Sequence, residues 1–150
     1  MKNEEVKQTL IQALEKDEYW VVRREAAKVI EWLKIEEAIP TLTKVMKEDL
    51  DKVRKRAIFT LMNFEEKAAT AISELIEILQ HDENYAMRMA AAMVLTRIGE
   101  KAEETIPDLI SMIKKDKDLV VREAAVWVLR AIGSTEAIKT LEGRNEERKK

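Results

Sequence analysis

The chain has 150 residues, and its 27 Lys and Arg against 29 Asp and Glu give a formal net charge of −2. That balance argues against a protein that wraps phosphate backbones, because such proteins carry a basic surplus. Cysteine is absent, which excludes a disulfide framework and thiolate chemistry. With 46% hydrophobic and 37% charged residues but only three glycines and two prolines, the composition predicts an all-α protein of amphipathic helices.

The N-terminal segment and the apolar runs give no sign of export or membrane insertion. Residues 1–16 lack the apolar centre of a signal peptide. The longest apolar run, residues 89–95, is far too short to cross a bilayer. We therefore expect a cytoplasmic protein without a membrane partner.

Nine helices are expected in chain order, in alternating A and B positions. They span about residues 3–15, 19–34, 36–47, 51–64, 66–80, 84–98, 102–115, 118–132 and 135–142. The first and every second one after it are A helices, and the others are B helices. The charged residues 143–150 are expected to fray as a tail, which leaves residues 1–142 as a single expected domain.

The four B helices repeat one pattern that can be aligned on an arginine. These repeat arginines, at spacings of 31, 34 and 34 residues, are Arg23, Arg54, Arg88 and Arg122. Three residues later lie the alanines Ala26, Ala57, Ala91 and Ala125. Seven and ten residues later lie Ile30, Leu61, Leu95 and Leu129, and Leu33, Phe64, Ile98 and Ile132. These offsets follow one face of an α-helix, so they predict the buried side of each B helix, with the alanines at close helix contacts.

The A helices carry a matching ladder of leucines and several signals for helix ends. The ladder consists of Leu10, Leu42, Leu75, Leu109 and Leu141. Acid pairs expected in first turns, where they offset the helix dipole, are Glu4–Glu5, Glu36–Glu37, Glu65–Glu66 and Glu103–Glu104. Asn84 and Asp118 are expected to cap B helices, and Gly99 and Gly133 to end them in a left-handed conformation.

The fourth unit, from Asp116 onward, reads D-x-x-x-V-V-R-x-A-A-x-x-x-L-x-x-I-G-x-x-x-A-I. The first unit matches it at Asp17, Val22, Arg23, Ala26, Ala27 and Leu33. This pattern resembles the HEAT-like repeats of the phycobilisome-lyase type over residues 6–141. The resemblance implies a right-handed α-solenoid of four HEAT-like helix pairs plus a C-terminal half repeat. The second and third units depart from the pattern, with Glu48 at the aspartate position and N-Y-A-M-R before the third arginine.

A carboxylate lies six residues before each repeat arginine. These turn carboxylates are Asp17, Glu48, Asp82 and Asp116. Catalysis needs one special site, whereas this pairing occurs four times, so we interpret it as structural. A carboxylate in the turn can accept hydrogen bonds from backbone amides and from the arginine fork. This recurrence resembles the ladder of stacked Asp and Arg side chains between the units of HEAT-like families.

The sequence contains no constellation typical of catalysis, metal binding or cofactor binding. The single histidine, His81, lies in an expected turn, and neither a His/Cys metal spacing nor a glycine-rich phosphate loop is present. Trp127 with Asp118 invites comparison with HEAT-like DNA glycosylases, but the charge balance argues against nucleic acid. We therefore expect no catalytic residue, no metal and no cofactor.

The side of the B helices opposite the core ladder should be polar in a solvated helix, but here it is largely apolar. The candidate binding residues on it are Phe59, Met62, Met89, Met93 and Trp127, with the basic rim residues Lys28, Lys55 and Arg130. A contiguous exposed apolar stripe marks a binding site, whereas the alternative is that these residues form core between repeats. Trp20 and Trp32, at the N-terminal end, are expected to cap the stack or to make a dimer contact.

These observations predict a non-enzymatic scaffold that binds a protein or peptide through the concave face of its B helices. The partner is an unidentified protein or peptide, and the chain itself is expected to be a monomer or weak dimer. Two alternatives stay open. One is an enzyme subunit or a chromophore-lyase-type chaperone, and the other is a designed scaffold without a ligand.

Overall fold

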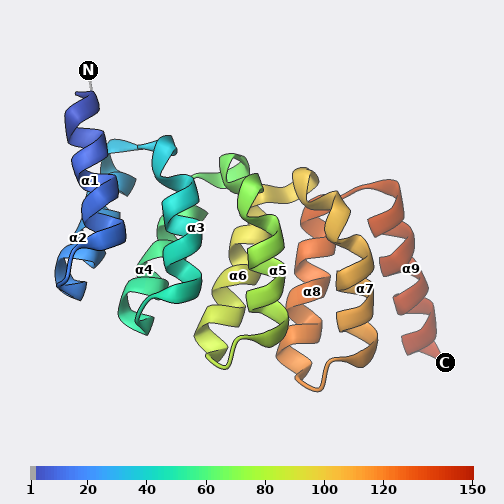
Figure 1. The fold of residues 1–150 in the computed structure, drawn as a ribbon. Coiled ribbons are helices and arrows are strands. Elements are labelled where there is room, and N and C mark those ends of the chain that lie inside the picture. The colour runs from blue at the N-terminus through green and yellow to red at the C-terminus, as the bar shows by residue number, and fades with distance from the viewer. Residues whose placement is uncertain (1–2) are drawn as a thin grey trace. The chain divides into compact units, whose positions relative to one another are not determined.

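The computed structural model describes residues 3–150, in which every regular element is a helix, as predicted (Figure 1). The chain divides into two compact units, residues 1–74 and 75–150, and each unit is described by itself. Among the described residues, no helix combines the length and the apolar character that a membrane span requires.

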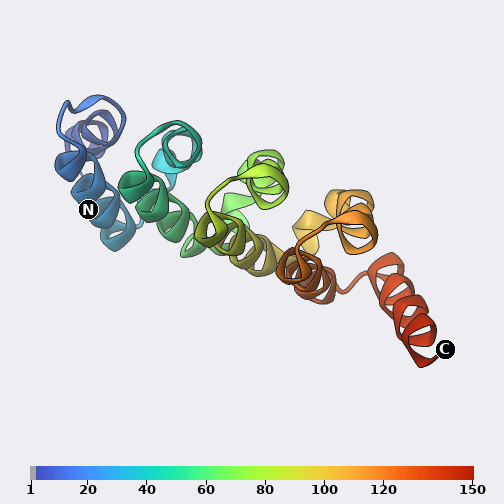
Figure 2. The ribbon, with the colours of Figure 1, turned by 90° about the horizontal axis from the view of Figure 1, so that it is seen from below.

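The first unit consists of two helix pairs. Its elements are α1 (Glu4–Lys16), α2 (Trp20–Leu33), η1 (Glu36–Ala38), α3 (Ile39–Glu48), α4 (Asp51–Met62) and η2 (Glu65–Ala71). Helix α1 packs against α2 and α3 packs against α4, while α2 contacts α4 and α1 contacts α3. The A helices α1 and α3 therefore form one layer and the B helices α2 and α4 a second (Figure 2).

The second unit repeats this arrangement after α5 (Ile72–His81), which begins just before the boundary. Its further elements are α6 (Tyr85–Ile98), η3 (Gly99–Thr105), α7 (Ile106–Lys115), α8 (Leu119–Ile132) and α9 (Thr135–Lys149). Helix α8 packs against its A helix, α7, and also against the neighbouring B helix, α6. This is the helix-pair architecture of an α-solenoid, which confirms the predicted all-α fold of helix pairs, while its right-handedness stays a prediction.

The buried side of the B helices is the one that the repeated pattern predicts. The fully buried residues on it include Ala57, Ala91, Ala125, Ile30, Leu61, Leu95 and Leu129. Ala26, in the first unit, is also buried. A small residue at this position lets two helices approach closely, and the aliphatic residues one turn later fill the space beside it.

Three A helices are preceded by a 3₁₀ segment that the sequence pattern did not separate from the α-helix. The segments η1, η2 and η3 lead into Ile39, Ile72 and Ile106. Pro40 and Pro107 lie in the first turns of α3 and α7, where an amide hydrogen is not needed by the helix. The expected place of three acid pairs was therefore wrong. Residues 36–37, 65–66 and 103–104 lie in 3₁₀ segments, and only Glu4–Glu5 opens an α-helix.

Two B helices begin at the predicted caps, and two others are followed by residues other than glycine that have an unexpected positive φ. The side chains of Asn84 and Asp118 accept hydrogen bonds from the amides of residues 86 and 120, at 3.0 and 2.9 Å. Eleven residues after each repeat arginine the backbone has a positive φ, in turn at Lys34 (54°), Glu65 (52°), Gly99 (65°) and Gly133 (64°). Gly133 is left-handed as predicted, whereas Gly99 combines its positive φ with a ψ of −130°.

Helix α9 continues past the expected end at residue 142, through the charged segment, to Lys149. It packs mainly against the B helix α8 and only slightly against the A helix α7. Arg144 and Arg148, one turn apart on α9, both contact the carboxylate of Glu123 on α8, at 2.5 and 3.1 Å. After Leu141 the helix has no apolar side chain. These ion pairs, rather than apolar packing, therefore attach its last turns to α8.

Candidate binding surface on the B helices

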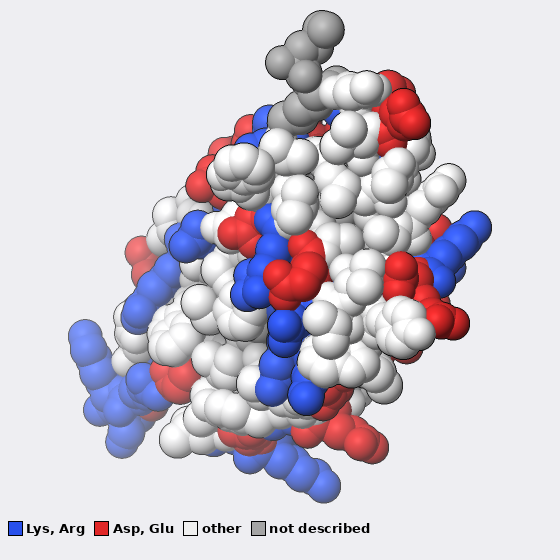
Figure 3. Space-filling view, turned by 90° about the vertical axis from the view of Figure 1, so that its left-hand side faces the viewer, with Lys and Arg blue, Asp and Glu red and all other residues white. Residues whose placement is uncertain are grey.

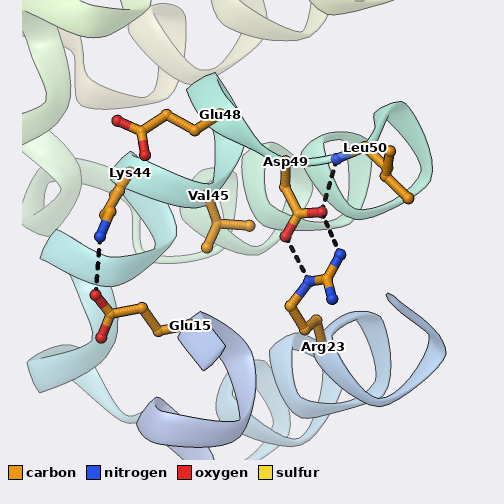
Figure 4. Close-up of a pocket in the computed structure, with 7 residues that line it drawn as sticks. All are labelled: Glu15, Arg23, Lys44, Val45, Glu48, Asp49 and Leu50. Carbon is orange, nitrogen blue, oxygen red and sulfur yellow. Dashed lines mark hydrogen bonds and ion pairs between the residues drawn. The ribbon is translucent and has the colours of Figure 1, made fainter. Parts of the chain in front are cut away.

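The repeat arginine Arg23 joins the two helix pairs of the first unit. From α2 it donates through Nε and Nη2 to both carboxylate oxygens of Asp49, at 2.7 Å each (Figure 4). Its Nη1 donates to the backbone carbonyl of Asp17 at 2.7 Å. Burial raises the pKa of Asp49, but the hydrogen bonds from Arg23 and from the Leu50 amide together lower it by more. Its net pKa therefore lies below the ordinary value. Asp49 in turn raises the pKa of Arg23.

The hollow above this pair has a volume of about 480 Å³ and is lined largely by charged side chains. Its lining residues are Glu15, Arg23, Lys44, Val45, Glu48, Asp49 and Leu50 (Figure 4). Lys44 pairs with Glu15 at 3.0 Å, while Arg23 is occupied by Asp49. Because both cations in the hollow are already paired, the site suits a structural joint between helix pairs.

The same joint occurs in the second unit. Arg88, on α6, donates to the backbone carbonyl of Asp82 at 2.8 Å and to the carboxylate of Asp118 at 3.0 Å. Asp118 caps α8 at the same time. Its pKa is lowered by the hydrogen bond from the Val120 amide and by Arg88, against an opposing effect of burial. Arg88 therefore connects the turn before α6 to the start of the neighbouring B helix.

Of the two hydrogen bonds predicted for the turn carboxylates, the one from a backbone amide is confirmed and the one from the arginine is not. Asp17, Asp82 and Asp116 each accept a hydrogen bond from the amide two residues later, at 2.9 Å. The predicted bond from the arginine to the same carboxylate was wrong, because Arg23, Arg88 and Arg122 donate to the main-chain carbonyl of that residue instead. The carboxylate is turned toward the following amide, so the carbonyl is left to face the guanidinium.

The second turn differs, as its shorter repeat spacing suggests. Glu48 was expected to be the turn carboxylate, but it is exposed and its neighbour Asp49 pairs with Arg23. Arg54 donates to the backbone carbonyl of Met46 at 2.8 Å rather than to the carbonyl six residues before it. In the second turn, therefore, a carbonyl acceptor of the repeat arginine lies eight residues before it instead of six.

In the second unit, two large apolar side chains of the predicted stripe are exposed. Met93 on α6 is 45% exposed, and Trp127 on α8 is 47% exposed. They occupy the same repeat position on two B helices that pack against each other. Their chain neighbours Val94, Val126 and Val128 are buried, so only a narrow strip of each helix reaches solvent. Of the other predicted residues in this unit, Met89 is half-buried and Arg130 is exposed.

In the first unit the predicted residues divide between surface and core. Phe59 is 42% exposed, and Lys28 and Lys55 are exposed as well. Met62, only 6% exposed, was wrongly placed on the surface. At about 100° per residue, Met62 lies nearer to the fully buried Ile58 than to Phe59 around the helix. Since the exposed residues belong to two separately described units, a stripe that is continuous over both stays a prediction.

The structure adds one surface residue that the sequence analysis did not assign to the B-helix side. Trp32 is 80% exposed, and it follows Lys28 by four residues, which places both on the same side of α2. A hollow of about 330 Å³ lies beside it, lined by Lys28, Glu31, Trp32, Lys34 and Arg56. We call this hollow the Trp32 pocket. The four-residue spacing from Lys28 was the signal that could have found Trp32, which was expected only to cap the stack or to make a dimer contact.

Trp20 occupies a more enclosed place than Trp32. The centre of its ring, at the start of α2, lies 5.2 Å from the guanidinium of Arg24 and 4.6 Å from the ammonium of Lys52. Two cations facing one indole ring form cation–π contacts, and Lys52 comes from the neighbouring B helix α4. Trp20 therefore helps to join α2 to α4. The expected dimer contact of this residue stays a prediction.

No constellation for metal chemistry was found in the part of the chain that the structure describes. Among residues 3–150, no group of three or more His, Cys, Asp or Glu side chains could hold a metal ion. His81 is exposed at the end of α5.

The comparisons with known proteins agree with this architecture. The family model for HEAT repeats matches residues 1–63 and 72–149, which is most of the chain. No curated protein matches the sequence. The two matched segments cover the alternating A and B helices of both units. The chain therefore belongs to the HEAT-repeat family.

Proposed function

We propose that this protein is a non-enzymatic scaffold that binds a protein or peptide partner through the exposed side of its B helices. HEAT repeats are generally protein-interaction scaffolds, and the chain carries them over most of its length. The observation that carries the proposal is the pair Met93 and Trp127, two large apolar side chains exposed in register on adjacent helices. Exposed apolar surface of this kind marks interaction sites, and Met adapts its shape to a partner.

A structural role of the recurring charged residues supports the non-enzymatic part of the proposal. The repeat arginines Arg23 and Arg88 are engaged with carboxylates and main-chain carbonyls of the scaffold itself. The finer family assignment, to the phycobilisome-lyase type, also stays a proposal, and the V-V-R-x-A-A pattern of the fourth unit supports it. A cytoplasmic location and a monomeric or weakly dimeric state stay predictions.

Affinity capture with matched variants tests this function. Wild-type protein and the double variant Trp127→Ala/Met93→Ala are immobilised and exposed to lysate of the source cell, and captured proteins are identified by mass spectrometry. The double variant should bind the captured partner more than tenfold more weakly, a change of about 1.4 kcal/mol, while its melting temperature changes little.

The control replaces two apolar residues of similar exposure on other helices, Val6→Ala on α1 and Ile138→Ala on α9. It should retain the partner at wild-type affinity. Equal binding by both double variants would contradict the proposal. A large loss of stability in Trp127→Ala/Met93→Ala with binding intact would show that these side chains serve the fold instead.

A further inference from the structure

The Trp32 pocket in the first unit begins with an indole ring that the fold leaves uncovered. At 80%, Trp32 has the largest exposed fraction among the large hydrophobic residues that are exposed in residues 3–150. Phe59 and Trp127, the other large aromatic residues exposed in the interior of B helices, are 42% and 47% exposed. A flat aromatic ring loses little conformational entropy when a partner covers it, which makes such a residue a common anchor of interfaces.

Lys34, at the rim of the pocket, has a backbone conformation that lysine rarely adopts. It follows α2 with φ 54° and ψ 48°, the left-handed region that favours glycine. The corresponding residues of the third and fourth repeats are Gly99 and Gly133, which reach positive φ without strain from a side chain. Strained residues of this kind occur preferentially at functional sites. The lysine puts a side chain into the pocket lining where glycine would put none.

The charges of the pocket leave it with a net positive lining. Of its cations, Lys28 pairs with Glu25 at 2.8 Å, and Arg56 lies 3.6 Å from Glu31. Glu31, the single acid of the lining, also accepts a hydrogen bond from Asn63 at 2.8 Å. Among the described residues, no ion pair or side-chain hydrogen bond of Lys34 was found. One ammonium group therefore stands available beside the exposed ring.

The pocket is not a repeated feature of the scaffold. Trp32 and Lys34 come from the first repeat and Arg56 from the second; at the corresponding positions the third repeat has Arg97 and Gly99, and the fourth repeat has Ala124. The turn carboxylates and repeat arginines recur because every joint needs them, whereas this combination of an aromatic and cations does not recur between the third and fourth repeats. A combination that is present between one pair of repeats and absent from the corresponding place in another is better explained by a ligand than by the fold.

We propose that the Trp32 pocket binds an acidic segment of the protein partner, with an apolar side chain against the Trp32 ring and a carboxylate paired with Lys34. This inference rests on the proposed function and specifies the chemistry of the partner. A phosphate backbone fits less well, because the carboxylates of Glu25 and Glu31 lie among the cations and would repel a continuous run of phosphates. A peptide places its carboxylates at separate positions, with apolar side chains between them.

The probe for this proposal is a dye-labelled twelve-residue peptide with a central Leu-Phe pair flanked by glutamates. Its partner is the same peptide with every glutamate replaced by glutamine. Binding to the full-length protein is followed by fluorescence anisotropy, and the indole N–H signals of the tryptophans are followed by NMR. The acidic peptide should bind at least roughly tenfold more tightly than the neutral one, and it should shift the indole signal of Trp32. Raising the salt concentration should weaken the acidic peptide more than the neutral one.

Lys34→Gly and Glu65→Gly form a matched pair of variants. Both remove a side chain at a positive φ in the first unit, so both should leave the melting temperature unchanged or raise it. Only Lys34→Gly removes a cation of the pocket, and it should weaken the acidic peptide by roughly tenfold. Glu65→Gly should bind as the wild type does. Equal peptide affinity of the two variants would overturn the proposal, as would equal binding of the acidic and neutral peptides to the wild type.

Two further results would also decide against the pocket. If a twelve-nucleotide oligothymidine displaces the peptide and shifts the Trp32 signal at lower concentration, the site belongs to nucleic acid rather than to a protein partner. If the peptide shifts the indole signal of Trp127 but not that of Trp32, the Trp32 pocket is not its site, while the proposed function through the exposed B-helix surface stands. Absence of any shift at millimolar peptide would overturn the acidic-segment proposal, and the capture experiment would still test the proposed function by itself.

Discussion

Arg23 binds both carboxylate oxygens of Asp49, and the two residues belong to successive helix pairs of the first unit. Their side chains are only 15% and 12% exposed, so each would be left in a poorly solvated place without the other. The face that α1 and α2 present in Figure 3 is a mixture of uncharged surface and charged side chains. Stacking of these helix pairs therefore includes a directional ionic contact as well as apolar packing.

Replacement of Arg23 by alanine should lower the free energy of unfolding by about 1–3 kcal/mol, because the carboxylate of Asp49 then lacks its charged partner. Arg23→Lys should recover part of the loss, since lysine keeps the charge but cannot form the bidentate fork. Urea unfolding followed by circular dichroism measures both. Lys44→Ala, which removes the more exposed ion pair with Glu15, serves as the control and should change stability little. If both alanine variants lose equally little free energy of unfolding, the bidentate pair of Arg23 and Asp49 does not stabilise the fold.

The pH dependence of stability should show the low pKa of Asp49. Because its folded pKa lies below its unfolded value, the stability from this group is fully present above the unfolded pKa near 4. That contribution is lost as the pH falls through the folded pKa. The pKa of Glu123, which burial raises but Arg144 and Arg148 lower further, acts in the same direction. Unfolding free energies between neutral and acid pH should therefore fall more steeply for the wild type than for Asp49→Asn, and parallel curves would contradict this assignment.

Glu65→Gly should raise the free energy of unfolding by roughly 1 kcal/mol, because glycine adopts the positive φ of residue 65 without strain from a side chain. Thermal unfolding measures the change as an increase in melting temperature. The opposite substitution, Gly133→Ala, places a Cβ on a left-handed residue and should destabilise the protein. A fall in melting temperature for both variants would mean that the Glu65 side chain makes a contact worth more than the backbone strain.

Ala91→Leu should destabilise the protein by about 1–3 kcal/mol, since Ala91 is fully buried on α6 and a larger side chain would overpack the helix contact. Differential scanning calorimetry of this variant can be compared with Ala86→Leu, the same change at an exposed position of α6. The exposed substitution should leave the melting temperature nearly unchanged. An unaltered melting temperature for Ala91→Leu would remove the assignment of the alanines to close contacts.

The double variant Arg144→Ala/Arg148→Ala should loosen the last turns of α9, because these arginines attach the helix to Glu123 beyond its last apolar residue. Hydrogen exchange measured by mass spectrometry should show faster exchange in residues 143–149. Residues 119–132 of α8 should keep their protection and act as the internal control. Unchanged protection throughout α9 would show that the ion pairs do not hold this segment.

The sequence was sufficient for the helices and their buried sides, because a repeated 3-7-10 spacing specifies one direction around each helix. The sequence was insufficient for residues whose burial depends on how a neighbouring helix packs beside them. Met62 and Phe59 both lie away from the core ladder, yet Met62 is buried and Phe59 is exposed. The spacing indicates a direction, whereas burial depends on what packs beside it.

The partners of the charged residues were also beyond the sequence pattern. Six residues separate Asp82 from Arg88, and either the carboxylate or the main-chain carbonyl of Asp82 could have met the guanidinium. The carboxylate that Arg88 binds, that of Asp118, lies thirty residues later. Such pairing follows from the stacking geometry, as does the strained backbone of Lys34, which no helix-ending signal marked.

The position of α9 decides how a longer version of this scaffold would have to be built. Ala27 of α2 accepts a hydrogen bond from Thr60 of α4, so the flank that carries Ala27 receives the following B helix. The corresponding residue of α8, Val126, is buried, and Glu123 on α8 is held by arginines of α9. Helix α9 thus occupies the docking place of a fifth B helix. Extra repeats should accordingly be inserted between Gly133 and Ser134, so that α9 packs against the last B helix of the extended protein.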